Sequence, residues 1–136
     1  DNGNTKPKDY LKNVKALCWW RSVFTTAIHL AYKLGFREIY LCGTVFALED
    51  DKEYAYDVRL TDGQKEYNRK TYDATVRNLR NSLPALKNAG VKLISCSPNS
   101  QINEFLEYVE YNVVTSELID LENDLHSVKH SSEFVE

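Results

Sequence analysis

Two apolar runs, each preceded by an amphipathic helical pattern that ends at a glycine, constrain the fold of this chain most strongly. Residues 39–46 and 91–96 are nearly all apolar, as is typical of strands buried on both faces of a parallel sheet. The first helical pattern starts after Ser22, which is suited to cap it, and ends at Gly35, which is suited to terminate it. The alternation predicts an α/β fold with two parallel strands joined by a right-handed crossover.

The second helix is predicted from Thr71 to Gly90, on the evidence of an apolar stripe with helical spacing. Pro84 lies inside that stripe, so the helix is expected to kink or break near Ser82. After the second strand, Ser100 is expected to cap a short helix.

The predicted strands are too few for a stable sheet, because two strands do not persist alone. Residues 14–20 form either a further strand or a buried coil, and the polar residues 1–12 are expected to be a loose lead-in. We assign residues 1–112 to the α/β domain, including a long loop over 47–70, and 113–136 to a final amphipathic helix and tail. The sheet is therefore completed either by a partner copy or by a longer α/β domain.

Length and charge exclude several classes of function. The chain has 136 residues, which suits one domain, and no apolar run approaches the roughly 18 residues of a membrane span. Its polar start shows no secretory signal. With 17 basic and 20 acidic residues the net charge is −3, so nucleic-acid binding is not expected. A bound phosphate would have to be held by local geometry.

The cysteines are three in number and show no C-x-x-C spacing. Cys42 and Cys96 fall inside the apolar runs, which favours buried free thiols, and Cys18 follows another apolar stretch. Free thiols favour a reducing, cytoplasmic compartment.

The carboxyl ends of the two strands are the predicted ligand-binding edge, as in open α/β sheets generally. A helix N-terminus reaching that edge, such as the one at Ser22, binds phosphate without net positive charge. The alternative is that Ser22 and Ser100 are simply N-caps. The residues expected at the edge are Gly43, Thr44 and Val45 after the first strand, and Ser97, Pro98, Asn99 and Ser100 after the second.

Tyr54 and Tyr56 lie in the long loop after the first strand. A tyrosine hydroxyl donates a hydrogen bond to a phosphate or a leaving group without adding charge. The alternative for both residues is packing within the loop.

The order of these segments resembles the bacterial sialyltransferases of glycosyltransferase family forty-two and the related Rossmann-like carbohydrate and lipooligosaccharide enzymes. The resemblance extends over residues 22–109. It is carried by residues 31–43, by the Y-A-Y-D motif at 54–57 and by the S-P-N-S turn at 97–100, with Phe105 after it.

The resemblance implies a Rossmann-like three-layer fold with a short, mostly parallel sheet, of which this chain matches the C-terminal half. It also implies metal-independent sugar transfer, without a cofactor, from a sugar nucleotide such as a CMP-sugar to a glycan acceptor. Tyr54 would stabilise the departing phosphate, since neutral donors aimed at developing charge lower the barrier. The implied substrate-binding residues are Ser22, Gly43, Thr44, Tyr56, Pro98, Asn99 and Ser100.

Two departures from the family pattern favour a second hypothesis. Val45 stands where the family has an aspartate, and residues 58–75 contain no histidine to act as the family's general base. The second hypothesis is a non-catalytic α/β module that keeps the scaffold and acts through homo-oligomerisation, because open strand edges invite pairing. A third hypothesis is a diphosphate-transfer enzyme. Such an enzyme normally needs Mg²⁺ and a carboxylate at the end of the strand, where this chain has Val45.

No metal site is expected from the remaining acidic and histidine residues. Glu49, Asp50 and Asp51 lack the D-x-D spacing and favour a solvated turn. His126 and His130 are four residues apart but have no third ligand near them in the sequence.

Overall fold

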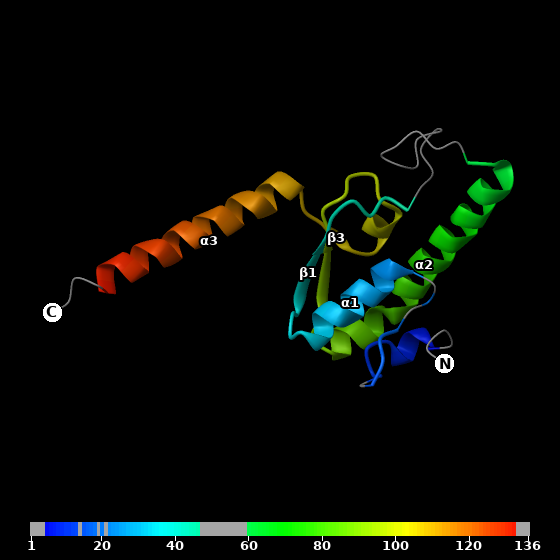
Figure 1. Ribbon diagram of the computed structural model, residues 1–136, viewed down its shortest axis with the longest axis horizontal. Helices are drawn as coiled ribbons and strands as arrows, with labels where there is room; N and C mark the ends of the chain where they lie inside the picture. Colours follow the sequence, from blue (N-terminus) through cyan, green and yellow to red (C-terminus); the bar gives the residue numbers. More distant parts are fainter. Residues whose placement is uncertain (1–4, 14, 19, 21, 47–59, 133–136) are drawn as a thin grey trace.

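The chain adopts the α/β fold class predicted from the sequence, with a short, open, three-stranded parallel sheet (Figure 1). The computed structural model describes residues 5–13, 15–18, 20, 22–46 and 60–132, with side chains as far as residue 127. The elements in order are η2 (Pro7–Asp9), α1 (Val23–Lys33), β1 (Glu38–Leu41), α2 (Asp62–Asn88), β2 (Lys92–Ser95), η3 (Gln101–Glu104), β3 (Glu107–Tyr108) and α3 (Tyr111–Ser132), where η denotes a 3-10 helix.

The sheet has the strand order β1-β2-β3, and both neighbouring pairs are parallel. Leu41 lies opposite Ser95, and Ile94 lies opposite Glu107. The predicted parallel pairing of the first two strands is confirmed. The third strand, however, is β3, and the described part of residues 14–20 contains no strand.

The first strand is shorter and less buried than its apolar run predicts. β1 ends at Leu41, Gly43 turns the chain with a φ of 68°, and Tyr40 is only half-buried. The expectation of burial on both faces is wrong for β1, because it is an edge strand. Apolar character alone does not distinguish an edge strand from a central one.

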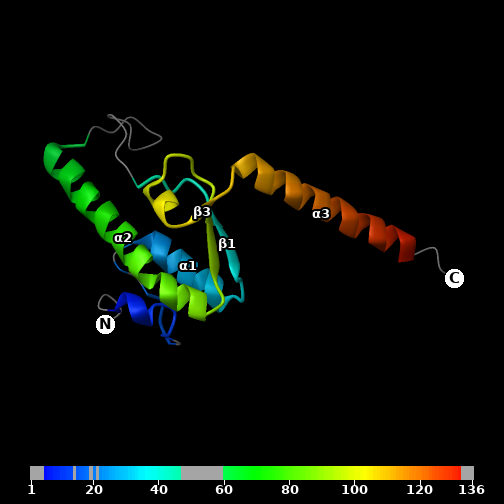
Figure 2. The ribbon, with the colours of Figure 1, turned by 180° about the vertical axis from the view of Figure 1, so that it is seen from behind.

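Helices α1 and α2 pack on one face of the sheet. Ile28 of α1 and Leu79 of α2 belong to the same buried cluster as Leu41 of β1 and Leu93 of β2. A helical layer on the opposite face would have to come from α3. Both ribbon views instead show α3 leaving the sheet and pointing away from the other elements (Figures 1 and 2).

Helix α1 begins and ends as predicted. Ser22 is the N-cap residue, although its side chain makes no capping hydrogen bond. At the other end Gly35 has a φ of 99°, and its N–H donates to the Tyr32 carbonyl at 3.0 Å. The Phe36 N–H donates to the Ala31 carbonyl at 3.1 Å, which completes a Schellman ending.

Helix α2 begins nine residues earlier than predicted, at Asp62 rather than Thr71. Thr61 and Gln64 form a capping box in which the Gln64 N–H donates to the Thr61 hydroxyl and the Thr61 N–H donates to the Gln64 side chain. The helix also continues through Pro84, so the expected break is absent. Residues buried on both sides of the proline hold it in place, which outweighs the lost backbone hydrogen bond.

The N-terminal segment is part of the core, so the prediction of a loose lead-in is wrong. Tyr10 is only 1% exposed, and its hydroxyl donates to the Thr25 carbonyl of α1 at 2.6 Å. Its ring stacks on Trp20 with centroids 4.7 Å apart. A single buried aromatic residue therefore anchors a segment that is otherwise polar.

His29 is buried beneath that segment and is held in its neutral form. Its Nδ1 accepts a hydrogen bond from the Cys18 N–H at 2.7 Å, which a protonated imidazole cannot do. Burial, and then the nearby charge of Lys33, lowers the pKa of His29 below its ordinary value of 6.5.

We expect the free energy of unfolding to fall as the pH drops below about 6.5, because the unfolded chain then binds a proton that folded His29 resists. Above that pH the contribution is fully present. Denaturant titrations between pH 8 and pH 5 check this, and His29→Asn should flatten the pH dependence.

No helix in the described part of the chain is long and apolar enough to cross a membrane.

Candidate functional site

The edge at which ligand binding is predicted is a rim formed by two loops, residues 42–46 after β1 and residues 96–100 after β2. The Thr44 N–H donates to the Ser97 hydroxyl at 2.9 Å, and the Ser100 hydroxyl donates to the Thr44 carbonyl. The Gln101 side chain donates to the Phe46 carbonyl at 2.7 Å. The two loops are thus held together directly.

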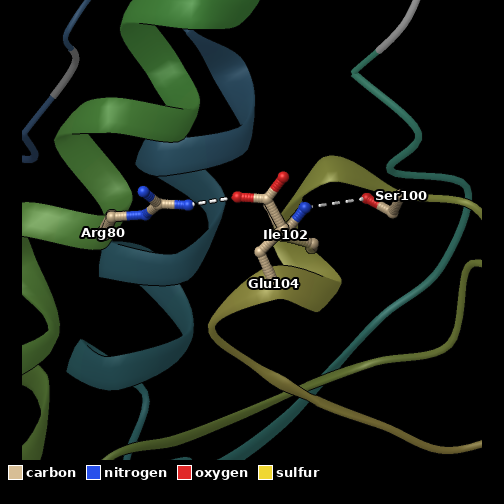
Figure 3. Close-up of polar contacts among 4 residues, drawn as sticks. All are labelled: Arg80, Ser100, Ile102 and Glu104. Carbon is tan, nitrogen blue, oxygen red and sulfur yellow. Dashed lines mark hydrogen bonds and ion pairs between the residues drawn. The ribbon is translucent and has the colours of Figure 1, made fainter.

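The hydroxyl of Ser100, one of the predicted substrate-binding residues, is used inside this network. Ser97 and Ser100 are buried, and the Ser100 oxygen also accepts from the Ile102 N–H at 3.4 Å (Figure 3). Ser100 is the N-cap residue of η3, as its position in the sequence predicts. A hydroxyl that already bonds to backbone groups must give up those hydrogen bonds to bind a ligand. In this structure the network therefore holds the two loops in place.

The solvent-facing part of the rim is small. Gly43, Pro98 and Asn99 are exposed, and Asn99 adopts a left-handed φ of 60°. Asparagine tolerates that conformation in turns. These residues, Thr44 and the buried Ser100 are the predicted site residues that the fold brings to one edge.

The other predicted site residues are placed differently. Ser22 begins α1 at the same end of the sheet, since the ring of Phe24 contacts that of Phe46 with centroids 5.0 Å apart. The Ser22 carbonyl accepts from the hydroxyls of Thr25 and Thr26. Tyr54 and Tyr56 lie outside the described residues.

A groove of about 200 Å³ lies between α2 and η3, and Gln101, directly after the rim, lines it. Arg80 forms an ion pair with Glu104 across it (Figure 3), and its guanidinium also lies over the Phe105 ring, 4.9 Å from the centroid. The charge of Arg80 is therefore already compensated. The lining residues are Asp73, Val76, Arg77, Arg80, Gln101 and Glu104.

Two further cavities lie elsewhere. One of about 500 Å³ is lined by N-terminal residues between Thr5 and Asn13, and one of about 290 Å³ includes Val91 and Lys92 at the start of β2. Neither includes a predicted site residue.

Among the residues that the structure describes, no three His, Cys, Asp or Glu side chains gather to hold a metal ion. Glu49, Asp50 and Asp51 lie outside those residues, as does the side chain of His130.

The cysteines are free, but one of them is not buried. Cys18 and Cys96 are buried as predicted, whereas Cys42 is exposed. The prediction fails at Cys42 because β1 ends one residue before it.

No protein-family model, curated protein or solved structure matches this chain. The resemblance to glycosyltransferase family forty-two therefore stays a hypothesis.

Part of the apolar pattern that predicts α1 forms a stripe on the outer, exposed face of that helix. Val23 is 81% exposed, Leu30 is 45% exposed and Leu34 is 68% exposed, with Ala27 exposed between them. The spacing of four, three and four residues places them in one line along the helix. The amphipathic pattern is visible in the sequence, but it does not tell whether the apolar side of the helix faces its own sheet or the solvent. We call these four residues the α1 stripe.

A second apolar stripe lies on α3, within the amphipathic pattern that predicts the final helix. Leu118, Leu121 and Leu125 are 56%, 58% and 66% exposed, and their spacing of three and four places them on one face. Val114, one turn before them, is buried and so anchors the start of the helix. The final helix is predicted from the sequence, but its pattern does not show whether its leucines pack on the chain's own sheet or stay exposed. We call the three leucines the α3 stripe.

Proposed function

We propose that this chain is a non-catalytic α/β module that forms a homodimer through the α1 stripe and the α3 stripe. The observation that carries the proposal is the exposure of more than half of each leucine of the α3 stripe on a helix that points away from its own domain. An apolar line of this kind is typical of an interaction surface.

The charges beside the two stripes favour pairing α3 with α1. Residues 93–128 contain seven acidic residues and no lysine or arginine, and Asp120, Glu122 and Asp124 lie within the stretch that carries the α3 stripe. Lys33 lies on α1 and Arg37 follows it, both exposed. Opposite charges beside an apolar contact favour that contact. Pairing α3 with α3 would bring acidic flanks together.

A second copy is the occupant that fits this geometry. Because α3 points away from its own α1, the contact is proposed to form between chains, with the α3 stripe of each copy on the α1 stripe of the other. Such an arrangement has two-fold symmetry. The contact between the α1 stripe and the α3 stripe therefore forms twice, and the assembly closes as a dimer. The α1 stripe spans about 16 Å along the helix axis, enough for two turns of a partner helix.

Exchanging one apolar residue for a charge in each stripe tests the proposal. We expect Leu30→Asp and Leu121→Asp each to weaken or abolish the dimer, measured by light scattering after size-exclusion chromatography. Burying an unpaired carboxylate in an apolar contact is costly. Ile119→Asp is the matched control: Ile119 is 57% exposed on the same helix but lies to the side of the α3 stripe. It should leave the dimer intact.

Mixing the two variants identifies the paired surfaces. A mixture of Leu30→Asp and Leu121→Asp can form a mixed dimer with one intact α1–α3 contact, so part of the association should return. If instead α3 pairs with α3, Leu30→Asp alone remains a full dimer. A wild type that stays monomeric contradicts the proposed function itself. Circular dichroism of each variant confirms that it is folded.

A second candidate function is binding of a sugar nucleotide at the rim, with a glycan as the acceptor if transfer occurs. It is favoured by the parallel pairing of β1 and β2, which places Gly43, Thr44, Pro98 and Asn99 at one edge. Tyr54 would be its catalytic residue. The unpaired cysteines support a cytoplasmic location for either function.

Calorimetry with CMP tests this second candidate. We expect at most weak binding, at millimolar concentration, and a loss of heat in Tyr54→Phe if the tyrosine contacts the nucleotide. Tyr67→Phe is the matched control, because it removes the same hydroxyl from an exposed tyrosine of α2 outside the predicted site, and it should leave the heat unchanged. The absence of any heat with millimolar CMP rejects the candidate.

A further inference from the structure

Cys42 and Cys96 lie at the same position on neighbouring strands, at the base of the rim. Leu41 is paired with Ser95 in the parallel register, and the Cys96 N–H donates to the Leu41 carbonyl at 2.9 Å. The next pair along the register is therefore Cys42 with Cys96. Paired residues on adjacent strands direct their side chains to the same face of a sheet.

The two cysteines are neighbours across the β1–β2 pair. Burial raises the pKa of the Cys96 thiol, and the neighbouring Cys42 thiol raises it further. Adjacent strands are about 4.8 Å apart, which lies inside the separation of Cα atoms, about 4.4–6.8 Å, that a disulfide bridges. The pair therefore needs little backbone movement to form a bond.

Accessibility gives the two sulfurs different roles. Cys42 is exposed and open to a reagent in solution, whereas Cys96 is 5% exposed and Cys18 is 1% exposed. Cys18 lies in a separate part of the core, where its N–H donates to His29. Reaction at Cys42 followed by closure onto Cys96 is the sequence that this arrangement favours.

We propose that Cys42 and Cys96 form a redox modification site, a dithiol that small disulfides oxidise to an intramolecular bond across the rim. The Cys42 thiolate attacks one sulfur of a low-molecular-weight disulfide, forms a mixed disulfide and releases one small thiol. The Cys96 thiolate then attacks the Cys42 sulfur and releases the second small thiol. The protein loses two electrons and two protons, which reduce the small disulfide to two thiols.

The bond would join the ends of β1 and β2 where the two rim loops begin. Gly43 and Thr44 follow Cys42 directly, and Ser97 follows Cys96. Oxidation would thus add a covalent link beside the hydrogen bonds that already connect these loops, and resist their separation. The inference is independent of the proposed dimer, because none of these residues belongs to the α1 stripe or the α3 stripe.

Incubation of the full chain with oxidised glutathione, followed by intact mass measurement and peptide mapping, tests the site. We expect the wild type to become two hydrogens lighter, with one peptide pair linked through Cys42 and Cys96 and Cys18 still a thiol. Cys96→Ser should stop at the first step and keep one glutathione on Cys42. Cys42→Ser should acquire neither the adduct nor the bond, because Cys96 is shielded.

Three results would overturn the inference. A stable glutathione adduct on wild-type Cys42 would mean that Cys96 does not reach it. A Cys42–Cys42 bond between copies would assign the exposed thiol to another partner. Unreacted Cys42 in a folded wild type would show that the reagent does not reach it. Circular dichroism before and after incubation establishes that the reaction occurs in the folded state.

Discussion

Replacement of Tyr10 by alanine is expected to lower the free energy of unfolding by about 3–5 kcal/mol, the range for truncating a large buried aromatic side chain. The effect has two sources. The variant loses the stacking contact with Trp20, and it leaves the Thr25 carbonyl without the hydroxyl that donates to it at 2.6 Å. Urea titration monitored by far-UV circular dichroism measures the change.

Tyr10→Phe and Tyr67→Ala separate these contributions. The phenylalanine variant keeps the ring and loses only the hydrogen bond, so we expect about 1–3 kcal/mol. Tyr67 is 62% exposed on α2, and its replacement by alanine should change stability by less than about 0.5 kcal/mol. A Tyr10→Ala variant as stable as Tyr67→Ala would contradict the placement of the N-terminal segment in the core.

Replacement of Ile102 by alanine is the second change with a large expected effect. Ile102 is fully buried, and it lies in η3, directly after the rim. We expect a loss of about 2–5 kcal/mol, because the cavity left behind would lie between the rim and α2. Thermal unfolding followed by circular dichroism gives the difference from wild type.

Ile119→Ala is the control for this change, since it removes the same atoms from an exposed position on α3. It should be neutral or slightly stabilising, because alanine favours the helix. Equal effects of the two substitutions would mean that η3 does not anchor the rim to the core.

The parallel sheet and its ligand edge could be predicted from the sequence because they depend on local patterns. An apolar run after a helix that ends at a glycine predicts each of β1 and β2. The parallel register of these strands then places Thr44 within hydrogen-bonding distance of Ser97 and Ser100. The start of α2 was also readable, since Thr61 and Gln64 carry the spacing of a capping box. The prediction of a start at Thr71 is wrong because it relies on the apolar stripe and not on the capping box at Thr61.

Other features depend on tertiary contacts that no local pattern encodes. The burial of Tyr10 follows from a partner fifteen residues away, and β3 has only two residues. The helix through Pro84 persists because its neighbours are packed on both sides. The hydrogen bonds of the rim serines also depend on tertiary contacts. The sequence places Ser97 and Ser100 at the edge of the sheet, but it does not show that the hydroxyls of both residues bond to the backbone of Thr44 in the opposite loop.

The proposed dimer is tested most directly by sedimentation velocity of the unmodified chain over about 1 to 100 µM, the range in which an interface of modest size would dissociate. We predict a concentration-dependent shift from the 15.7 kDa monomer to a species of twice that mass, and no larger assembly. A single 15.7 kDa species at every concentration would contradict the account.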